Sequence, residues 1–153
     1  MPDRLTVDRA TSSATRVALA DEPAKMTGNS AADALICVVD DDESVRDSFR
    51  TLLETLGFAV TTYASGPDIL ADERRHQASC VIVDQHMPEM DGLTTLGALR
   101  RDQSGVRIIL ITGRLDAEIA ARAAALEVDA ILEKPLSVPR LLELIRASSE
   151  PRR

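Results

Sequence analysis

Short apolar runs alternate with amphipathic segments along most of the chain. Each run is short enough for a buried strand and is followed by charged or turn-forming residues, as expected for parallel strands covered on both faces. After the first run, apolar residues from Val45 to Leu56 mark one face of a helix that Gly57 can end. The strands are predicted at residues 35–39, 58–63, 80–83, 106–111 and 130–133.

A helix is expected after each predicted strand. Ser65, Asp116 and Ser137 are suitable N-caps, and Pro67 fits the first turn of a short helix. The helices are predicted at residues 45–56, 65–70, 93–100, 116–126 and 138–146. Parallel neighbours need crossover connections, which are right-handed. The alternation therefore predicts an α/β fold: a doubly wound, five-stranded parallel sheet with five helices on its two faces.

The regular pattern covers one stretch of the chain. Residues 1–33 are rich in Ala, Thr, Ser and Asp and show no sustained period, which predicts a flexible N-terminal extension. Residues 34–148 are expected to form a single domain, and residues 149–153 a polar tail. Met26 is an alternative to Met1 as the true start of the protein.

Composition excludes several classes of function. The chain has 18 basic and 25 acidic residues, a net charge of −7, no basic stripe and few aromatic residues, which argues against direct binding of nucleic acid. It has no apolar run of membrane-spanning length, so a cytoplasmic protein is expected. Cys37 and Cys80 lie in apolar runs without a Cys-x-x-Cys pair, which favours a structural role for both.

Polar residues follow four of the five predicted strands. Asp40 and Asp41 follow the first strand, Asp84 the third, Thr112 the fourth and Lys134 the fifth. Each alone has a simple explanation, such as helix capping or solvation. A parallel sheet, however, places all these strand ends at one edge, where ligands bind in open α/β folds.

The chemistry of this set is consistent. Carboxylates a few Å apart repel one another, so either one takes up a proton or a divalent cation binds, and Mg²⁺ suits a site with few oxygen ligands. A carboxylate beside Mg²⁺ can attack a phosphoryl group to form an aspartyl phosphate. The Lys134 ammonium and the Thr112 hydroxyl could then stabilise charge on the phosphoryl oxygens.

As an ordered set, these motifs resemble the receiver domain of two-component response regulators, the CheY-like superfamily. The Thr-Gly and Glu-Lys-Pro motifs are similar to the nitrogen-fixation regulator type. The resemblance spans roughly residues 35–147 and implies the flavodoxin-like strand order 2-1-3-4-5 and a cis bond before Pro135. The residues that carry it are Asp40-Asp41, Asp84, Met87-Pro88, Met90-Asp91-Gly92, Thr112-Gly113 and Glu133-Lys134-Pro135.

The resemblance implies that Asp84 is the phosphoacceptor. It would receive the phosphoryl group from the phosphohistidine of a histidine kinase or histidine phosphotransferase. Mg²⁺ would be bound by Asp41, Asp84 and the main-chain carbonyl of His86, with Asp40 assisting through water. A catalytic role for the His86 side chain is not expected, although it and Arg114 flank the site and could tune the lifetime of the aspartyl phosphate. The protein would be a response regulator that catalyses only its own phosphorylation and dephosphorylation.

Two features depart from the family pattern. By resemblance, Lys134 would pair with the phosphoryl group and Thr112 would close on it, while an aromatic residue three positions before Lys134 swings inward. Here that second switch position is Ile131, and Glu127-Val128 replaces the usual Gly-Ala turn. The phosphorylation chemistry is therefore expected to be intact, whereas the Thr-aromatic coupling is in question.

The output of the domain is expected to be a change in affinity for a downstream protein partner. No further domain follows in this sequence, so a stand-alone regulator is expected, and a homodimer through the last helices is a further alternative. A phosphorylation-independent scaffold with the receiver fold stays open because of Ile131 and Glu127. A phosphohydrolase of the haloacid-dehalogenase type is the enzyme alternative, because Asp40-x-Asp42 followed by Ser44 resembles its nucleophile motif.

Overall fold

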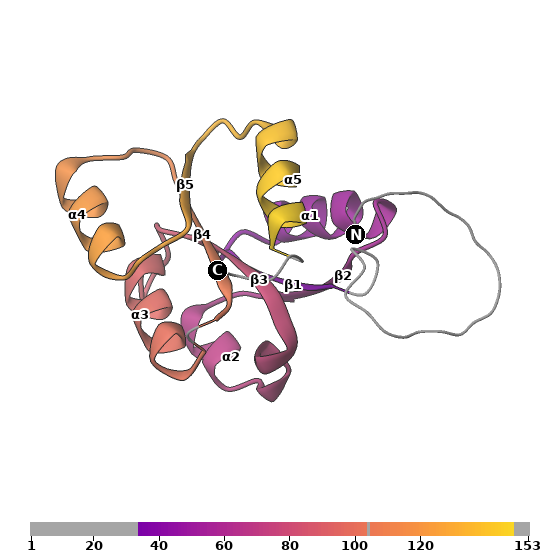
Figure 1. Ribbon diagram of the computed structural model, residues 1–153, viewed down its shortest axis with the longest axis horizontal. Coiled ribbons are helices and arrows are strands. Elements are labelled where there is room, and N and C mark those ends of the chain that lie inside the picture. The colour runs from indigo at the N-terminus through magenta and orange to yellow at the C-terminus, as the bar shows by residue number, and fades with distance from the viewer. Residues whose placement is uncertain (1–33, 104, 149–153) are drawn as a thin grey trace, which may run out of the picture.

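A five-stranded parallel sheet forms the centre of the molecule in the computed structural model, which describes residues 34–103 and 105–148 (Figure 1). The strand order is β2-β1-β3-β4-β5, and every neighbouring pair is parallel, so the predicted doubly wound, flavodoxin-like topology is confirmed. The strands are β1 (Leu35–Val39), β2 (Ala59–Tyr63), β3 (Ala78–Asp84), β4 (Arg107–Thr112) and β5 (Ala130–Glu133).

Within residues 34–103 and 105–148, five α-helices cover the two faces of this sheet. Helices α1 and α5 lie on one face, and α2, α3 and α4 on the other (Figure 1). A short 3-10 helix, η3, precedes β3 and was not predicted, because its five residues carry no apolar period. The helices are α1 (Glu43–Thr55), α2 (Gly66–Leu70), η3 (Glu73–Gln77), α3 (Gly92–Asp102), α4 (Ala117–Ala125) and α5 (Val138–Ala147).

Side-chain caps fix where the helices begin. Ser65, Asp116 and Ser137 each accept a hydrogen bond from a backbone N–H in the first turn of their helix, as predicted. Gly57 has a φ of 97° just after α1, which ends that helix in the left-handed conformation. The prediction that the helix includes Leu56 was wrong: α1 ends at Thr55, and Leu56 is its C-cap and is 41% exposed.

Alternate residues of the strands build two apolar cores. On one face Phe49 and Leu53 of α1 and Leu141 and Ile145 of α5 pack on the sheet, and on the other Leu96 of α3 lies at 0% exposure among residues of β1, β3 and β4. Burial of both sheet faces explains why the strands read as continuous apolar runs. It also leaves the carboxyl ends of the strands as the edge where polar residues gather.

The predicted extension over residues 1–33 and the predicted tail over residues 149–153 lie outside the described residues. Within the described residues, no helix is both long and apolar enough to cross a membrane.

Candidate functional site

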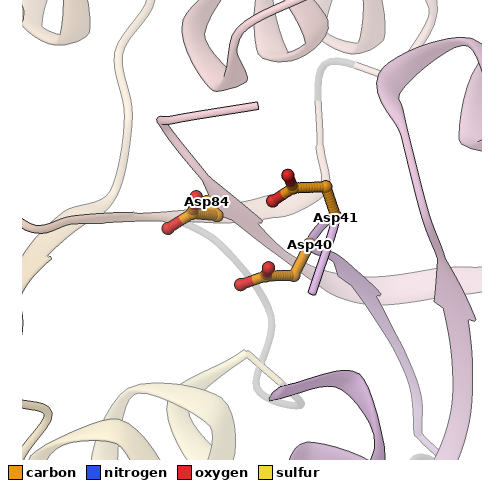
Figure 2. A group of neighbouring side chains, drawn as sticks. All are labelled: Asp40, Asp41 and Asp84. Carbon is orange, nitrogen blue, oxygen red and sulfur yellow. The ribbon is translucent and has the colours of Figure 1, made fainter. Parts of the chain in front are cut away.

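Three carboxylates meet at the ends of β1 and β3. Val39 pairs with Val83 across the two strands, so Asp40 and Asp41 emerge beside Asp84. One oxygen from each of the three lies within 4.8 Å of the others. Figure 2 shows the side chains of Asp40 and Asp41 directed toward Asp84. Asp40 and Asp84 are buried and Asp41 is exposed, so the cluster opens to solvent on one side.

The electrostatics of the cluster disfavour three unpaired charges. Burial, with the nearby Asp84 charge, raises the pKa of Asp40, although a hydrogen bond from the Asp42 N–H to Asp40 Oδ1 at 2.9 Å opposes the shift. The Arg46 guanidinium donates to the Asp40 main-chain oxygen, at 2.7 Å. A cation bound among the three carboxylates would offset this repulsion.

Lys134 supplies one cation from the end of β5. Its Nζ lies 3.0 Å from Asp84 Oδ1, and this contact raises the pKa of the Lys134 ammonium. The Lys134 N–H donates to the Thr112 main-chain oxygen at 2.9 Å, which fixes the strand end from which the side chain extends. The Lys134–Pro135 bond is cis, as the family resemblance implied.

The donor set fits a hard divalent cation. Asp84 Oδ2 accepts a hydrogen bond from the His86 N–H at 3.1 Å, whereas buried Asp84 Oδ1 receives no well-directed hydrogen bond from the described residues, despite the nearby ammonium. An oxygen with free lone pairs beside two further carboxylates suits Mg²⁺, which takes oxygen ligands and retains several waters.

The loop after Asp84 requires glycine at position 92. A Cβ on Gly92 would lie 2.6 Å from the Asp84 carbonyl oxygen, closer than side-chain carbons approach a backbone. The Gly92 N–H donates to the Gln85 carbonyl at 3.1 Å, which closes the loop on itself. The Asp-Gly pair in the sequence therefore reflects a close approach of two backbone segments behind the phosphoacceptor candidate.

Gln85 and Arg122 are site neighbours that the sequence pattern did not reveal. Gln85 is buried; its Oε1 accepts from the Leu93 N–H at 2.9 Å and its Nε2 donates to Asp91 Oδ2 at 3.2 Å. Arg122 of α4 pairs with the same Asp91 oxygen at 3.3 Å. Partial burial opposes the change, but hydrogen bonds from Thr94 and Arg122 hold the pKa of Asp91 below its usual value. The Arg122–Asp91 pair depends on which side of α4 faces the loop, and periodicity alone does not determine that side.

Thr112 lies at the end of β4 with 0% exposure. Its hydroxyl lies 3.0 Å from the Arg114 carbonyl and 3.2 Å from the Arg114 N–H, and His86 Nε2 lies 3.2 Å away. The structure therefore brings Thr112 and His86 together at the site and shows the hydroxyl engaged with the β4–α4 loop.

The two departures from the family pattern lie beside α4. Ile131 pairs with Leu110 in the sheet and packs, partly buried, against the core that includes Ile119 of α4. Glu127 adopts a φ of 57° after α4, the left-handed conformation for which glycine is best suited. Arg100 of α3 donates to the Glu127 carbonyl at 2.9 Å and so satisfies an acceptor at this helix end.

Asp42 is engaged elsewhere. Its Oδ1 accepts from both the Ser44 N–H and the Ser44 hydroxyl, at 2.9 and 2.8 Å, and it forms the N-cap of α1. The Asp40-x-Asp42 pair therefore does not point two carboxylates into the cluster, as a phosphohydrolase of the dehalogenase type would need.

The fold and site together define a class of protein: a doubly wound α/β domain with a lysine-paired acidic site at the carboxyl ends of its strands. Within this class, residues 36–146 match the response regulator receiver domain, and the chain belongs to that family. Members of the family are receiver domains of two-component systems, which bind Mg²⁺ at an acidic pocket and interact with kinases and downstream effectors.

Two relatives illustrate the sequence similarity. The transcriptional regulatory protein FixJ of Bradyrhizobium diazoefficiens is 34% identical over 113 residues, which cover 74% of this chain and 55% of FixJ. The tetrathionate response regulatory protein TtrR of Salmonella typhimurium is 35% identical over 108 residues, 71% of this chain and 52% of TtrR. The chain thus spans about half the length of the curated relatives that it matches.

Solved structures give the same fold. Chemotaxis protein CheY4 of Vibrio cholerae superposes with a TM-score of 0.70 at 26% identity, over 75% of this chain and 98% of CheY4. The response regulator StyR superposes with a TM-score of 0.68 at 33% identity, over 75% of this chain and 58% of StyR.

Proposed function

We propose that this receiver domain accepts a phosphoryl group on Asp84 from the phosphohistidine of a histidine kinase or histidine phosphotransferase. The observation that carries the proposal is the position of Asp84, buried at the end of β3 between two carboxylates and the Lys134 ammonium. In the acceptor step, an Asp84 carboxylate oxygen attacks phosphorus, the P–N bond breaks, and the donor imidazole leaves as a neutral ring after taking up a proton.

Each site residue has a proposed role in this step. Asp41, Asp84 and the His86 main-chain carbonyl would hold Mg²⁺, and Asp40 would assist through water. Mg²⁺ would neutralise charge on the phosphoryl oxygens. Lys134 lies within ion-pair distance of Asp84, where its ammonium can balance the negative charge of a phosphoryl oxygen that Mg²⁺ does not contact.

The proposed output is a change in affinity for a downstream protein. Phosphorylation can shift the equilibrium between two conformations only as far as the phosphoryl group interacts differently with each. Thr112 and Ile131 are the proposed switch positions, and a homodimer through the last helices is one form that the output could take. FixJ and TtrR are named as regulatory proteins, but this chain matches only about half of each, so their regulatory targets are not assigned to it.

Incubation with acetyl phosphate and Mg²⁺, followed by intact-mass measurement, tests the proposal. The wild-type protein should gain the mass of one phosphoryl group, and the gain should disappear with a chelator and in Asp84→Asn. Asp47→Asn is the matched control, because Asp47 is an exposed residue of α1, and it should be phosphorylated like the wild type.

A phosphorylation-independent scaffold is the second candidate. The observation that favours it is Ile131, an aliphatic residue on β5 where the family pattern places an aromatic one. A wild-type protein that gains no mass from acetyl phosphate or from a competent phosphohistidine donor, while still binding a partner, would support the scaffold instead.

A further inference from the structure

The Thr112 hydroxyl is closely surrounded by polar partners in this conformation. A hydroxyl offers one proton and two acceptor sites, and Thr112 Oγ1 has three polar neighbours within 3.2 Å: the Arg114 carbonyl, the Arg114 N–H and His86 Nε2. Because Thr112 is 0% exposed, bulk water does not compete for these positions. The present orientation of the hydroxyl is therefore well satisfied.

Both neutral tautomers of His86 can bind the Thr112 hydroxyl. When Nε2 carries the proton, it donates to Thr112 Oγ1 and the hydroxyl donates to the Arg114 carbonyl. When Nε2 lacks the proton, it accepts the hydroxyl proton in place of that carbonyl. In either case, the contact between the imidazole and Oγ1 would be lost if the hydroxyl turned toward Asp84.

The His86 contact differs in kind from the two Arg114 contacts. The Arg114 partners are main-chain groups two residues from Thr112, so any residue other than proline at position 114 supplies them. The His86 contact comes from a side chain 26 residues away in the sequence. The backbone N–H of the same residue donates to Asp84 Oδ2. One residue thus joins the phosphoacceptor to the hydroxyl that would respond to it.

We infer that the His86 imidazole is a positioning residue that holds the Thr112 hydroxyl in its unphosphorylated orientation. The inference rests on the proposed function, since it concerns the response to a phosphoryl group on Asp84. The Ile131 side chain has no polar atom that could bind the hydroxyl. Among side chains, His86 is therefore the one that competes with the phosphoryl group for Thr112, in addition to the Arg114 main chain. Loss of the imidazole should therefore favour the active orientation.

Replacing His86 tests the inference in the intact protein. In His86→Leu, three-bond NMR couplings should show the Thr112 side chain averaging over rotamers, whereas the wild type should hold one. With Mg²⁺, beryllofluoride should bind His86→Leu about two- to fivefold more tightly than the wild type. This is the low end of the net contribution of one hydrogen bond, because the exposed His86 side chain can also bond to water. His86→Gln, which can place an amide near the hydroxyl, should restore wild-type behaviour in both measurements.

A double-mutant cycle shows whether the effect acts through Thr112. The gain in beryllofluoride affinity from His86→Leu should vanish when Thr112 is already Val. An unchanged single rotamer in His86→Leu, or an affinity gain that persists beside Thr112→Val, would overturn the inference. Absence of any beryllofluoride binding would count against Asp84 as acceptor, and the Thr112 couplings would still decide the His86 role.

Discussion

At the scale of single residues, surroundings determine which ionisable groups are available for chemistry. Asp84 is buried, yet it has a cation on one side and a cluster open to solvent on the other. Cys37 and Cys80 are equally buried, but they lie in the middle of apolar strands. Burial alone therefore does not make a site, because reactivity also needs access and a partner charge.

The two thiols should be inert in the folded protein. Burial raises the pKa of Cys37 to about 11, against a smaller opposing effect from Tyr63, and that of Cys80 to about 12. In the unfolded chain the thiols ionise above a pH of about 8.5, whereas in the folded protein they stay protonated. Ionisation therefore favours the unfolded state, and the free energy of unfolding should fall as pH rises above that value.

Alkylation followed by mass spectrometry checks this expectation. Iodoacetamide at pH 8 should leave both thiols unmodified in the native protein and label both in urea. Rapid labelling of either residue under native conditions would show that its strand is not buried as described.

Gly92 shows how one missing side chain supports the site. Gly92→Ala should destabilise the protein by about 1–3 kcal/mol, because its Cβ forces the backbone apart at Asp84, and it should slow phosphorylation. Gly97→Ala is the control in the same helix: its Cβ meets Leu126 Cδ2 at 3.6 Å, an ordinary contact. Urea unfolding of both variants should separate them, and equal stabilities would contradict the close approach.

At the scale of elements, helix caps and apolar periods were the parts most readable from the sequence. Ser65, Asp116 and Ser137 cap as predicted because a cap is a local contact between neighbours in the chain. Helix η3 and the Asp91–Arg122 pair were missed, because the first lacks periodicity and the second depends on how α3 and α4 pack. Long-range side-chain contacts leave no local pattern to detect.

The end of α4 offers an element-scale prediction. Glu127→Gly should stabilise the protein by about 1 kcal/mol, because a non-glycine residue in the left-handed conformation carries roughly that cost. The bond from Arg100 to the main chain of residue 127 is unaffected by the change. Urea denaturation measures the difference. Glu127→Ala, which keeps the backbone cost, should match the wild type, and a less stable Glu127→Gly would contradict the account.

At the scale of the whole molecule, the sheet topology determines where the chemistry lies. Residues as distant in the sequence as Asp40, Asp84 and Lys134 meet only because β1, β3 and β5 run parallel and end at one edge. The alternation of strands and helices was sufficient to predict that meeting. It could not predict the orientation of the Thr112 hydroxyl, because a 3.2 Å contact with His86 depends on side-chain packing in the finished fold.

The central claim is that Asp84, and neither of its two acidic neighbours, carries the phosphoryl group. Borohydride reduces an acyl phosphate to an alcohol, so reduction of the phosphorylated protein converts the modified aspartate to homoserine. Peptide mapping should find homoserine at position 84 alone, in an amount that follows the phosphorylated fraction. Homoserine at position 40 or 41, or none in a protein that has gained the phosphoryl mass, would contradict the account.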